Sequence, residues 1–250
     1  MATQSFALRH RWDSYFWLGF VTISWIIIAT GFWIPIEHRF TGHADYAAPL
    51  VLVLHVWVYF GWMVLLTTQT VFAAAGRMDR HRKFGQAVFA YAPLVPIAGI
   101  AAEVYSQRFW AQTDAENVRF FIVPLFMAMG FAVFAYAAWR NRFDSAAHKR
   151  CIYLATAMIV TGAYARTFGR DIDAALGSGP LGIWAHWFTG QNFMLAATLA
   201  YDQATRGTVH RVNRIAVPVL IACQAGAMLV WYSDWWPVFV RGLLTIPTPP

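Results

Sequence analysis

Seven long stretches of this 250-residue chain carry almost no charged side chains. A helix that crosses the hydrocarbon core of a bilayer needs about 20 mostly apolar residues, and each stretch meets or approaches that length. The stretches lie at 14–36, 47–75, 84–104, 120–139, 151–169, 180–202 and 214–236. The pattern therefore predicts an all-α, polytopic membrane protein, with seven transmembrane helices in one bundle over residues 1–250.

Composition agrees with a membrane protein. Only 12% of the residues are charged, about half the usual fraction of a soluble domain. The first stretch is longer than the apolar core of a signal peptide and no small-residue cleavage pattern follows it, so we expect a retained helix. Cys151 and Cys223 fall on different predicted helices without CxxC spacing, which excludes a disulfide scaffold and a cysteine-rich metal site.

The basic residues predict the orientation of the helices. Most of the 19 Lys and Arg residues lie at the N-terminus and after the second, fourth and sixth stretches. Basic loops favour the cytoplasmic side, so we expect a cytoplasmic N-terminus and a C-terminus outside. Because these residues form short groups between apolar runs, their expected partner is the lipid bilayer, with its phosphate headgroups, and no nucleic acid. They are Arg9, Arg11, Arg77, Arg80, Arg82, Lys83, Arg140, Arg142, Lys149, Arg150, Arg206, Arg211 and Arg214.

After the first helix, the chain reads as three similar hairpins. A histidine begins each returning helix, at His81, His148 and His210. His55 and His186 precede the first and third of these by 26 and 24 residues. Acidic residues follow each turn histidine by 22 to 24 residues, at Glu103, Asp171 and Asp234. The spacing indicates an internal repeat of one helix plus three hairpins, although hairpins of equal length also align by chance.

Ionisable groups inside a bilayer are costly and usually face a partner or a cavity. His55 and His186 are predicted at similar depths on repeat-related helices. Two such imidazoles can ligate one haem iron axially, or one transition metal together with Glu103 or Asp171. The alternative is that each histidine bonds a hydroxyl or carbonyl of a neighbouring helix.

Arg166 follows fifteen uncharged residues of the fifth stretch. Its guanidinium requires an anion, and Asp171, Glu103, a substrate carboxylate or a haem propionate would serve. Snorkelling to the outer interface explains the same residue.

Other polar groups allow two interpretations each. Glu37, His38, His43 and Asp45 in the first outer loop suit a metal by type, but their spacing matches no known metal signature, and an exposed loop is the alternative. The three turn histidines either converge to bind an anion or metal, or cap their helices and help basic neighbours hold lipid phosphates. Gln69, Gln191 and Asn192 either line a quinone pocket or bond between helices.

Two resemblances extend this interpretation. The sequences His81-Arg82-Lys83-x-Gly85 and Ala147-His148-Lys149-Arg150, with Arg166 ending the same helix, resemble a group of uncharacterised seven-helix bacterial inner-membrane proteins. That resemblance covers the second helix to the turn at His210, and it implies a multi-pass bacterial inner-membrane location but no activity. The paired histidines are loosely similar to transmembrane b-type cytochromes, which implies haem b. Those proteins offer two ligand pairs, whereas here only one pair has a suitable depth.

We therefore expect a polar pocket near the outer leaflet, formed by His55, Glu103, Arg166, Asp171 and His186. In this hypothesis His55 and His186 ligate haem b or a transition metal, Arg166 holds a propionate or substrate anion, and Glu103 or Asp171 moves protons. The reaction would be redox chemistry on a lipophilic substrate such as a quinone. The alternatives are a transporter or binding protein for a small anionic or lipophilic molecule, and an accessory subunit with partner membrane subunits.

Overall fold

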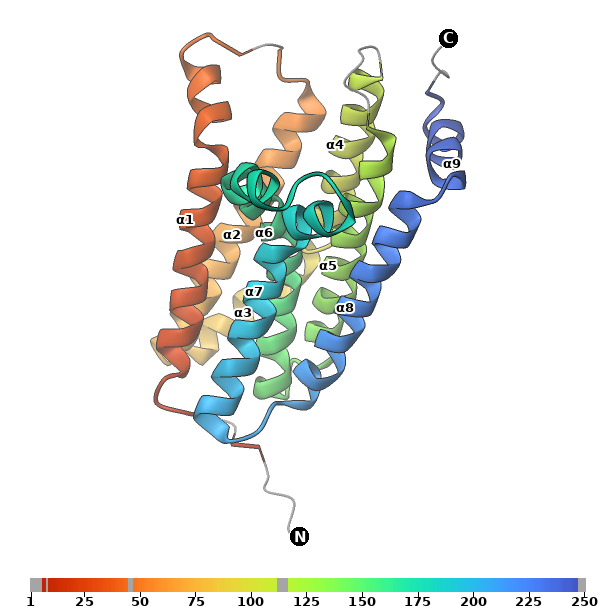
Figure 1. Cartoon of the computed structure of the whole chain (residues 1–250). Helices are drawn as coiled ribbons and strands as arrows, with labels where there is room; N and C mark the ends of the chain where they lie inside the picture. The colour runs from red at the N-terminus through yellow and green to blue at the C-terminus, as the bar shows by residue number, and fades with distance from the viewer. Residues whose placement is uncertain (1–5, 8, 45–46, 112–116, 247–250) are drawn as a thin grey trace.

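The computed structural model describes residues 6–7, 9–44, 47–111 and 117–246, and every regular element in this part of the chain is a helix (Figure 1). The all-α prediction is confirmed for these residues. The elements are α1 (Asp13–Phe40), α2 (Leu50–Ala74), α3 (Met78–Tyr91), α4 (Leu94–Trp110), the 3-10 helix η1 (Val118–Phe121), α5 (Ile122–Arg140), α6 (Ser145–Leu176), α7 (Pro180–Arg206), α8 (Arg211–Tyr232) and α9 (Trp235–Leu244).

Six helical segments are long and apolar enough to cross a membrane: α1, α2, α3 with α4, η1 with α5, α6 and α8. The multi-pass prediction therefore holds for six segments. The 27-residue α7 is long enough, but Gln191, Asn192 and Asp202 lower its apolar character. A membrane crossing by α7, the internal repeat and the orientation stay predictions.

The two ends of the bundle differ in their charges. The turns at 75–77, 141–144 and 207–210 lie at one end, together with the start of α1, and we call this the basic end (Figure 1). The opposite end carries α9, which the sequence did not predict. The chain leaves α8 after Tyr232, four residues before the helix end expected near 236, and re-enters a helix at Trp235. Trp236 and Val240 of α9 pack with Phe121 in a small second core.

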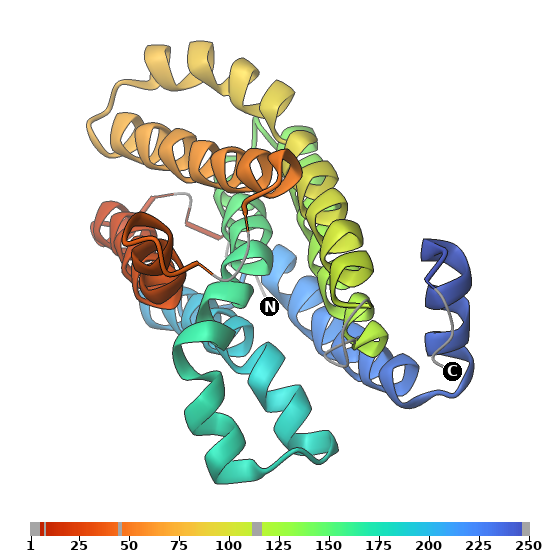
Figure 2. The ribbon, with the colours of Figure 1, turned by 90° about the horizontal axis from the view of Figure 1, so that it is seen from above.

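Prolines divide the predicted helix at 84–104 into α3 and α4. Pro93 and Pro96 stand at the start of α4, where a missing N–H is tolerated, whereas the proline rings prevent α3 from continuing unbroken. α3 packs against α2, while α4 packs against both α2 and α5. Seen from above, α3 leans away from α5 as a result (Figure 2).

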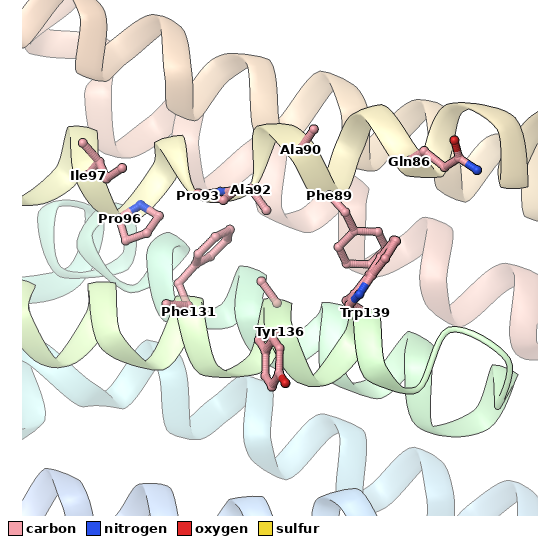
Figure 3. Close-up of a pocket in the computed structure, with 12 residues that line it drawn as sticks. Gln86, Phe89, Ala90, Ala92, Pro93, Pro96, Ile97, Phe131, Tyr136 and Trp139 are labelled. Carbon is pink, nitrogen blue, oxygen red and sulfur yellow. The ribbon is translucent and has the colours of Figure 1, made fainter.

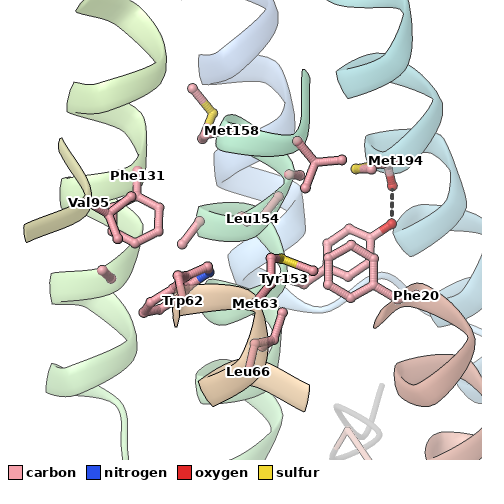
Figure 4. Close-up of a cluster of buried hydrophobic side chains, with 14 of the residues drawn as sticks. Phe20, Trp62, Met63, Leu66, Val95, Phe131, Tyr153, Leu154, Met158 and Met194 are labelled. Carbon is pink, nitrogen blue, oxygen red and sulfur yellow. Dashed lines mark hydrogen bonds between the residues drawn. The ribbon is translucent and has the colours of Figure 1, made fainter. Parts of the chain in front are cut away.

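α6 is the central helix and packs against α1, α5, α7 and α8. Small residues permit this packing: a Cβ added to Gly31 of α1 would lie 2.5 Å from the carbonyl oxygen of Ala163 in α6. Large apolar side chains fill the remaining space around Leu154 (Figure 4). Within this core, the Tyr153 hydroxyl donates to the Met194 carbonyl at 2.8 Å and so joins α6 to α7.

A buried ion pair joins α6 to α7 at the basic end. The side chains of Arg150 in α6 and Asp202 in α7 are both 0% exposed, and Arg150 Nε lies 3.0 Å from each carboxylate oxygen. Asp202 also accepts from Asn213 Nδ2 of α8 at 2.8 Å and from the backbone N–H of His210 at 3.1 Å. The Phe6 ring covers the guanidinium at 4.7 Å. The pair therefore joins three helices, and the charge of the aspartate is fully hydrogen-bonded.

A second ionic group lies beside this pair. Asp13 at the start of α1 accepts from Lys149 Nζ at 2.8 Å, from Arg206 Nη2 at 2.6 Å and from the Tyr201 hydroxyl. Three basic residues that we expected to face lipid phosphates, Lys149, Arg150 and Arg206, are thus tied to internal carboxylates. The expectation is wrong for these three because each has an acid within reach on a neighbouring helix.

Removing one partner of the buried pair tests its role. We expect Asp202→Ala to destabilise the protein by about 3–5 kcal/mol, because it leaves the Arg150 charge buried and unpaired, whereas Arg150→Met with Asp202→Leu recovers much of the loss. Thermal unfolding in mild detergent, followed by tryptophan fluorescence, measures both. The control Arg211→Gln removes the exposed pair with Asp144 and should cost at most about 1 kcal/mol. An Asp202→Ala protein as stable as the control would refute the assignment.

Candidate functional site

The structure brings three of the five predicted site residues near one another. His55 in α2 packs against Tyr59, with ring centres 4.2 Å apart, and its Nδ1 is buried without a hydrogen-bond partner among the described residues. Glu103 in α4 accepts from Gln107 Nε2 at 2.7 Å. Arg166 in α6 is close enough for its charge to act on both His55 and Glu103. The expected pocket of five residues stays a prediction.

Arg166 itself is exposed on the described chain. Its guanidinium lies 4.7 Å from the Phe32 ring centre of α1, and its Nη1 donates to the Gly162 carbonyl of its own helix at 3.0 Å. An exposed guanidinium can attract an anion, and the nearby Glu103 carboxyl group competes for the same positive charge.

His186 has a different environment from His55. Its Nδ1 lies 2.9 Å from Asp173 Oδ1, and its ring packs on Gly169, where an added Cβ would come within 2.5 Å of it. Asp171 lies in α6 and is exposed, and it is Asp173, not Asp171, that contacts His186. The connection between α6 and α7 projects from the side of the bundle away from α2 (Figure 2). The structure gives no contact between His55 and His186 in the part it describes, and their shared ligand role stays a prediction.

Two of the turn histidines lie together at the basic end. The ring centres of His81 in α3 and His148 in α6 are 6.2 Å apart, and the ring planes are nearly perpendicular at 87°. His81 Nδ1 lies 3.2 Å from the Gln69 backbone carbonyl oxygen, next to the Gln69 side-chain amide, and His148 Nδ1 lies 3.0 Å from the Ala138 carbonyl oxygen. In each residue, Nδ1 contacts a backbone carbonyl oxygen of the preceding helix, which is α2 for His81 and α5 for His148. Neither Nε2 makes a hydrogen bond with the described chain.

This arrangement suits a shared ligand. Because a carbonyl oxygen only accepts, His148 Nδ1 carries the proton and Nε2 keeps its lone pair in the neutral ring. Metal-ligating histidines commonly use the other ring nitrogen in this way. A metal–nitrogen bond is about 2 Å and the ring centre lies about 1 Å further, so imidazoles on opposite sides of one metal have centres about 6 Å apart. The separation of His81 and His148 matches that value.

The third turn histidine has a structural role. His210 is the N-cap of α8, and its Nδ1 accepts from the backbone N–H of Val212 at 3.2 Å. Burial lowers the pKa of His210 to about 4, and the charge of Arg150 acts in the same direction. The expected capping role is confirmed for His210. It is wrong for His148, because Asp144 caps α6 by accepting from two backbone N–H groups.

An apolar groove lies beside the histidine pair, between α3–α4 and α5, with a volume of about 680 Å³ (Figure 3). Phe89 and Trp139 face each other across it, with ring centres 5.1 Å apart. Phe89 also contacts the His148 ring, at 6.0 Å. Gly85 stands between His81 and Phe89 on α3, and a Cβ added there would meet only the Gln69 side-chain amide, at 3.9 Å. A small side chain at position 85 would therefore fit without a clash.

The other predicted polar groups have different outcomes. Among the described residues, no group of three or more His, Cys, Asp or Glu side chains could hold a metal ion. Asp45 lies outside the described residues, so the metal interpretation of Glu37, His38 and His43 stays a prediction. Gln224 of α8 donates to Gln191 at 2.6 Å and to Asn192 at 2.8 Å. The interhelical interpretation of these two amides is confirmed.

Comparison with protein-family models, curated proteins and solved structures finds no match to this chain.

The lowered pKa of His210 predicts a pH dependence. Because His210 titrates near 4 when folded and near 6.5 when unfolded, the unfolded chain binds the extra proton first as the pH falls. The stabilisation is therefore complete above about pH 6.5 and is lost as the pH falls towards 4. We expect His210→Asn, which keeps a capping acceptor, to flatten this part of a plot of melting temperature against pH. An unchanged slope in the variant would contradict this role.

Proposed function

We propose that this protein is a membrane redox protein that binds haem b through His81 and His148 at the basic end of the bundle. The observation that carries the proposal is the spacing and orientation of these two imidazoles, 6.2 Å apart with both Nδ1 atoms held by the preceding helices. Haem supplies one-electron chemistry when it is bound. Haem b is the cofactor expected from the sequence, but the proposed ligands are His81 and His148 in place of His55 and His186.

Haem fits this pair better than a bare metal ion does. The described residues offer two imidazoles and no third ligand nearby, whereas a haem iron needs only two axial ligands from the protein. Arg82 and Lys83 follow His81 directly and are exposed. Two basic side chains attract propionates and repel a free divalent cation. Gly85, four residues after His81 on the same face of α3, adds no side chain there.

The rest of the fold keeps the second ligand in place. Lys149 and Arg150, the two residues after His148, are tied to Asp13 of α1 and Asp202 of α7. The first turn of α6 is therefore fixed on two sides, which restricts the position of the His148 ring. Preorganised ligands of this kind lower the cost of binding a cofactor.

A second candidate function belongs to the opposite end of the bundle. The positive charge of Arg166, which is exposed on α6, favours binding of a small anionic molecule, with no cofactor involved. This role would make the protein a transporter or binding protein for such a molecule. Loss of anion binding in Arg166→Ala, with haem content unchanged, would support it as a separate site.

An absorption spectrum tests the proposal. The protein purified from haem-supplemented cells should show a Soret band, and His81→Ala and His148→Ala should each reduce haem content at least tenfold because one axial ligand is lost. Gly85→Leu should also reduce it, since the added side chain occupies the space beside His81. Gly226→Leu is the matched control, because nothing lies within 4 Å of a Cβ at Gly226.

Histidine variants outside the pair separate the possible outcomes. His210→Asn and His55→Ala should retain the Soret band. If His55→Ala and His186→Ala remove haem while His81→Ala does not, the ligands are the pair expected from sequence. If neither the unchanged protein nor any variant contains haem or metal, the cofactor proposal is wrong.

A further inference from the structure

The groove between α3–α4 and α5 has one apolar end and one basic end. Proline creates it, because the helix is interrupted at Pro93 and α3 packs mainly on α2, while Phe89 of α3 contacts Trp139 of α5. Towards α4, the groove is lined by Pro96, Ile97 and Phe131. Figure 3 shows these residues at one end and the Phe89–Trp139 pair, with Gln86, at the other. Its volume of about 680 Å³ is in the range of ligand sites.

A positively charged side chain lies at the end of the groove that Trp139 lines. The guanidinium of Arg142, an exposed residue of the turn between α5 and α6, lies 4.2 Å from the Trp139 ring centre. Its Nη1 donates to the Trp139 carbonyl oxygen at 3.0 Å, which holds the side chain at this place. The remaining guanidinium N–H groups can donate to an anion.

The small residues of the groove leave room along its length. Ala90 of α3 and Ala132 of α5 are exposed and line its walls. Because α3–α4 and η1–α5 are both apolar enough to cross a membrane, the groove opens towards acyl chains. An occupant that matches both ends must combine an apolar chain with an anionic group.

We propose that this groove binds one anionic phospholipid, with an acyl chain between α4 and α5 and the phosphate at Arg142. Because the groove has a positive charge at one end and apolar walls elsewhere, it suits a molecule with an anionic head and an apolar chain. A second copy of the chain would need a matching acid beside an apolar helix, and an uncharged quinone could accept a hydrogen bond from the guanidinium but would form no ion pair with it. The site does not depend on haem, since neither His81 nor His148 lines the groove, although Phe89 contacts both Trp139 and His148.

Native mass spectrometry of the full-length protein, taken from nanodiscs of equal phosphatidylglycerol and phosphatidylcholine, tests this site. We expect one retained phosphatidylglycerol per protein. Arg142→Gln should lower the preference for phosphatidylglycerol about fivefold, since it removes one basic contact at the membrane surface. Ala90→Phe should abolish retention by filling the groove.

Two controls match these variants. Arg77→Gln removes another exposed turn arginine, and Ala87→Phe adds the same ring to α3 at an exposed position outside the groove. Both should retain phosphatidylglycerol as the unchanged protein does. Equal retention of the two lipids, retention unaffected by Ala90→Phe, or a co-purified quinone in place of the lipid would each overturn the proposal.

Discussion

The buried pair of Arg150 and Asp202 is the constraint on which the basic end of the bundle depends. Neither charge could remain in an apolar interior alone, so α6 and α7 must meet at the one register that joins them. Asn213 and the backbone of His210 complete the carboxylate hydrogen bonds and fix the start of α8 as well. A single aspartate therefore sets the relative positions of three helices.

The position of His148 follows from that register. This histidine lies two residues before Arg150 in the first turn of α6, and Lys149 between them is held by Asp13. The first hairpin supplies the other imidazole, where Gln69 of α2 contacts His81 at the start of α3. Two separate hairpins thus deliver one ring each to the same place. The proposed haem site is a consequence of helix packing at the turns, and it needs no ligand from the middle of the bilayer.

Much of this fold could be predicted from the sequence, because hydropathy and helix length are local properties. The all-α class, six of the apolar helical segments and the interhelical role of Gln191 were predicted correctly. The break at Pro93 and the helix α9 were not, although both follow from local signals: prolines inside an apolar run, and an aromatic amphipathic stretch after Ser233. Hydropathy averages over about twenty residues and hides such short changes.

The partners of the charged residues could not be predicted in the same way. Asp202 inside the apolar run of α7 was the available signal, since an acid there requires a cation, but nothing local shows that Arg150 is that cation. His81 and His148 were recognised as equivalent turn residues. Their pairing, and the separate capping role of His210, depend on how the hairpins pack, which a repeat in the sequence does not determine.

The most direct measurement of the central claim is an electron cryomicroscopy map of the protein purified from haem-supplemented cells, at a resolution that shows side chains. We predict planar density between the imidazole rings of His81 and His148, continuous with both Nε2 atoms. Direct contact of the two rings with no density between them, or cofactor density at His55 or His186, would contradict the account.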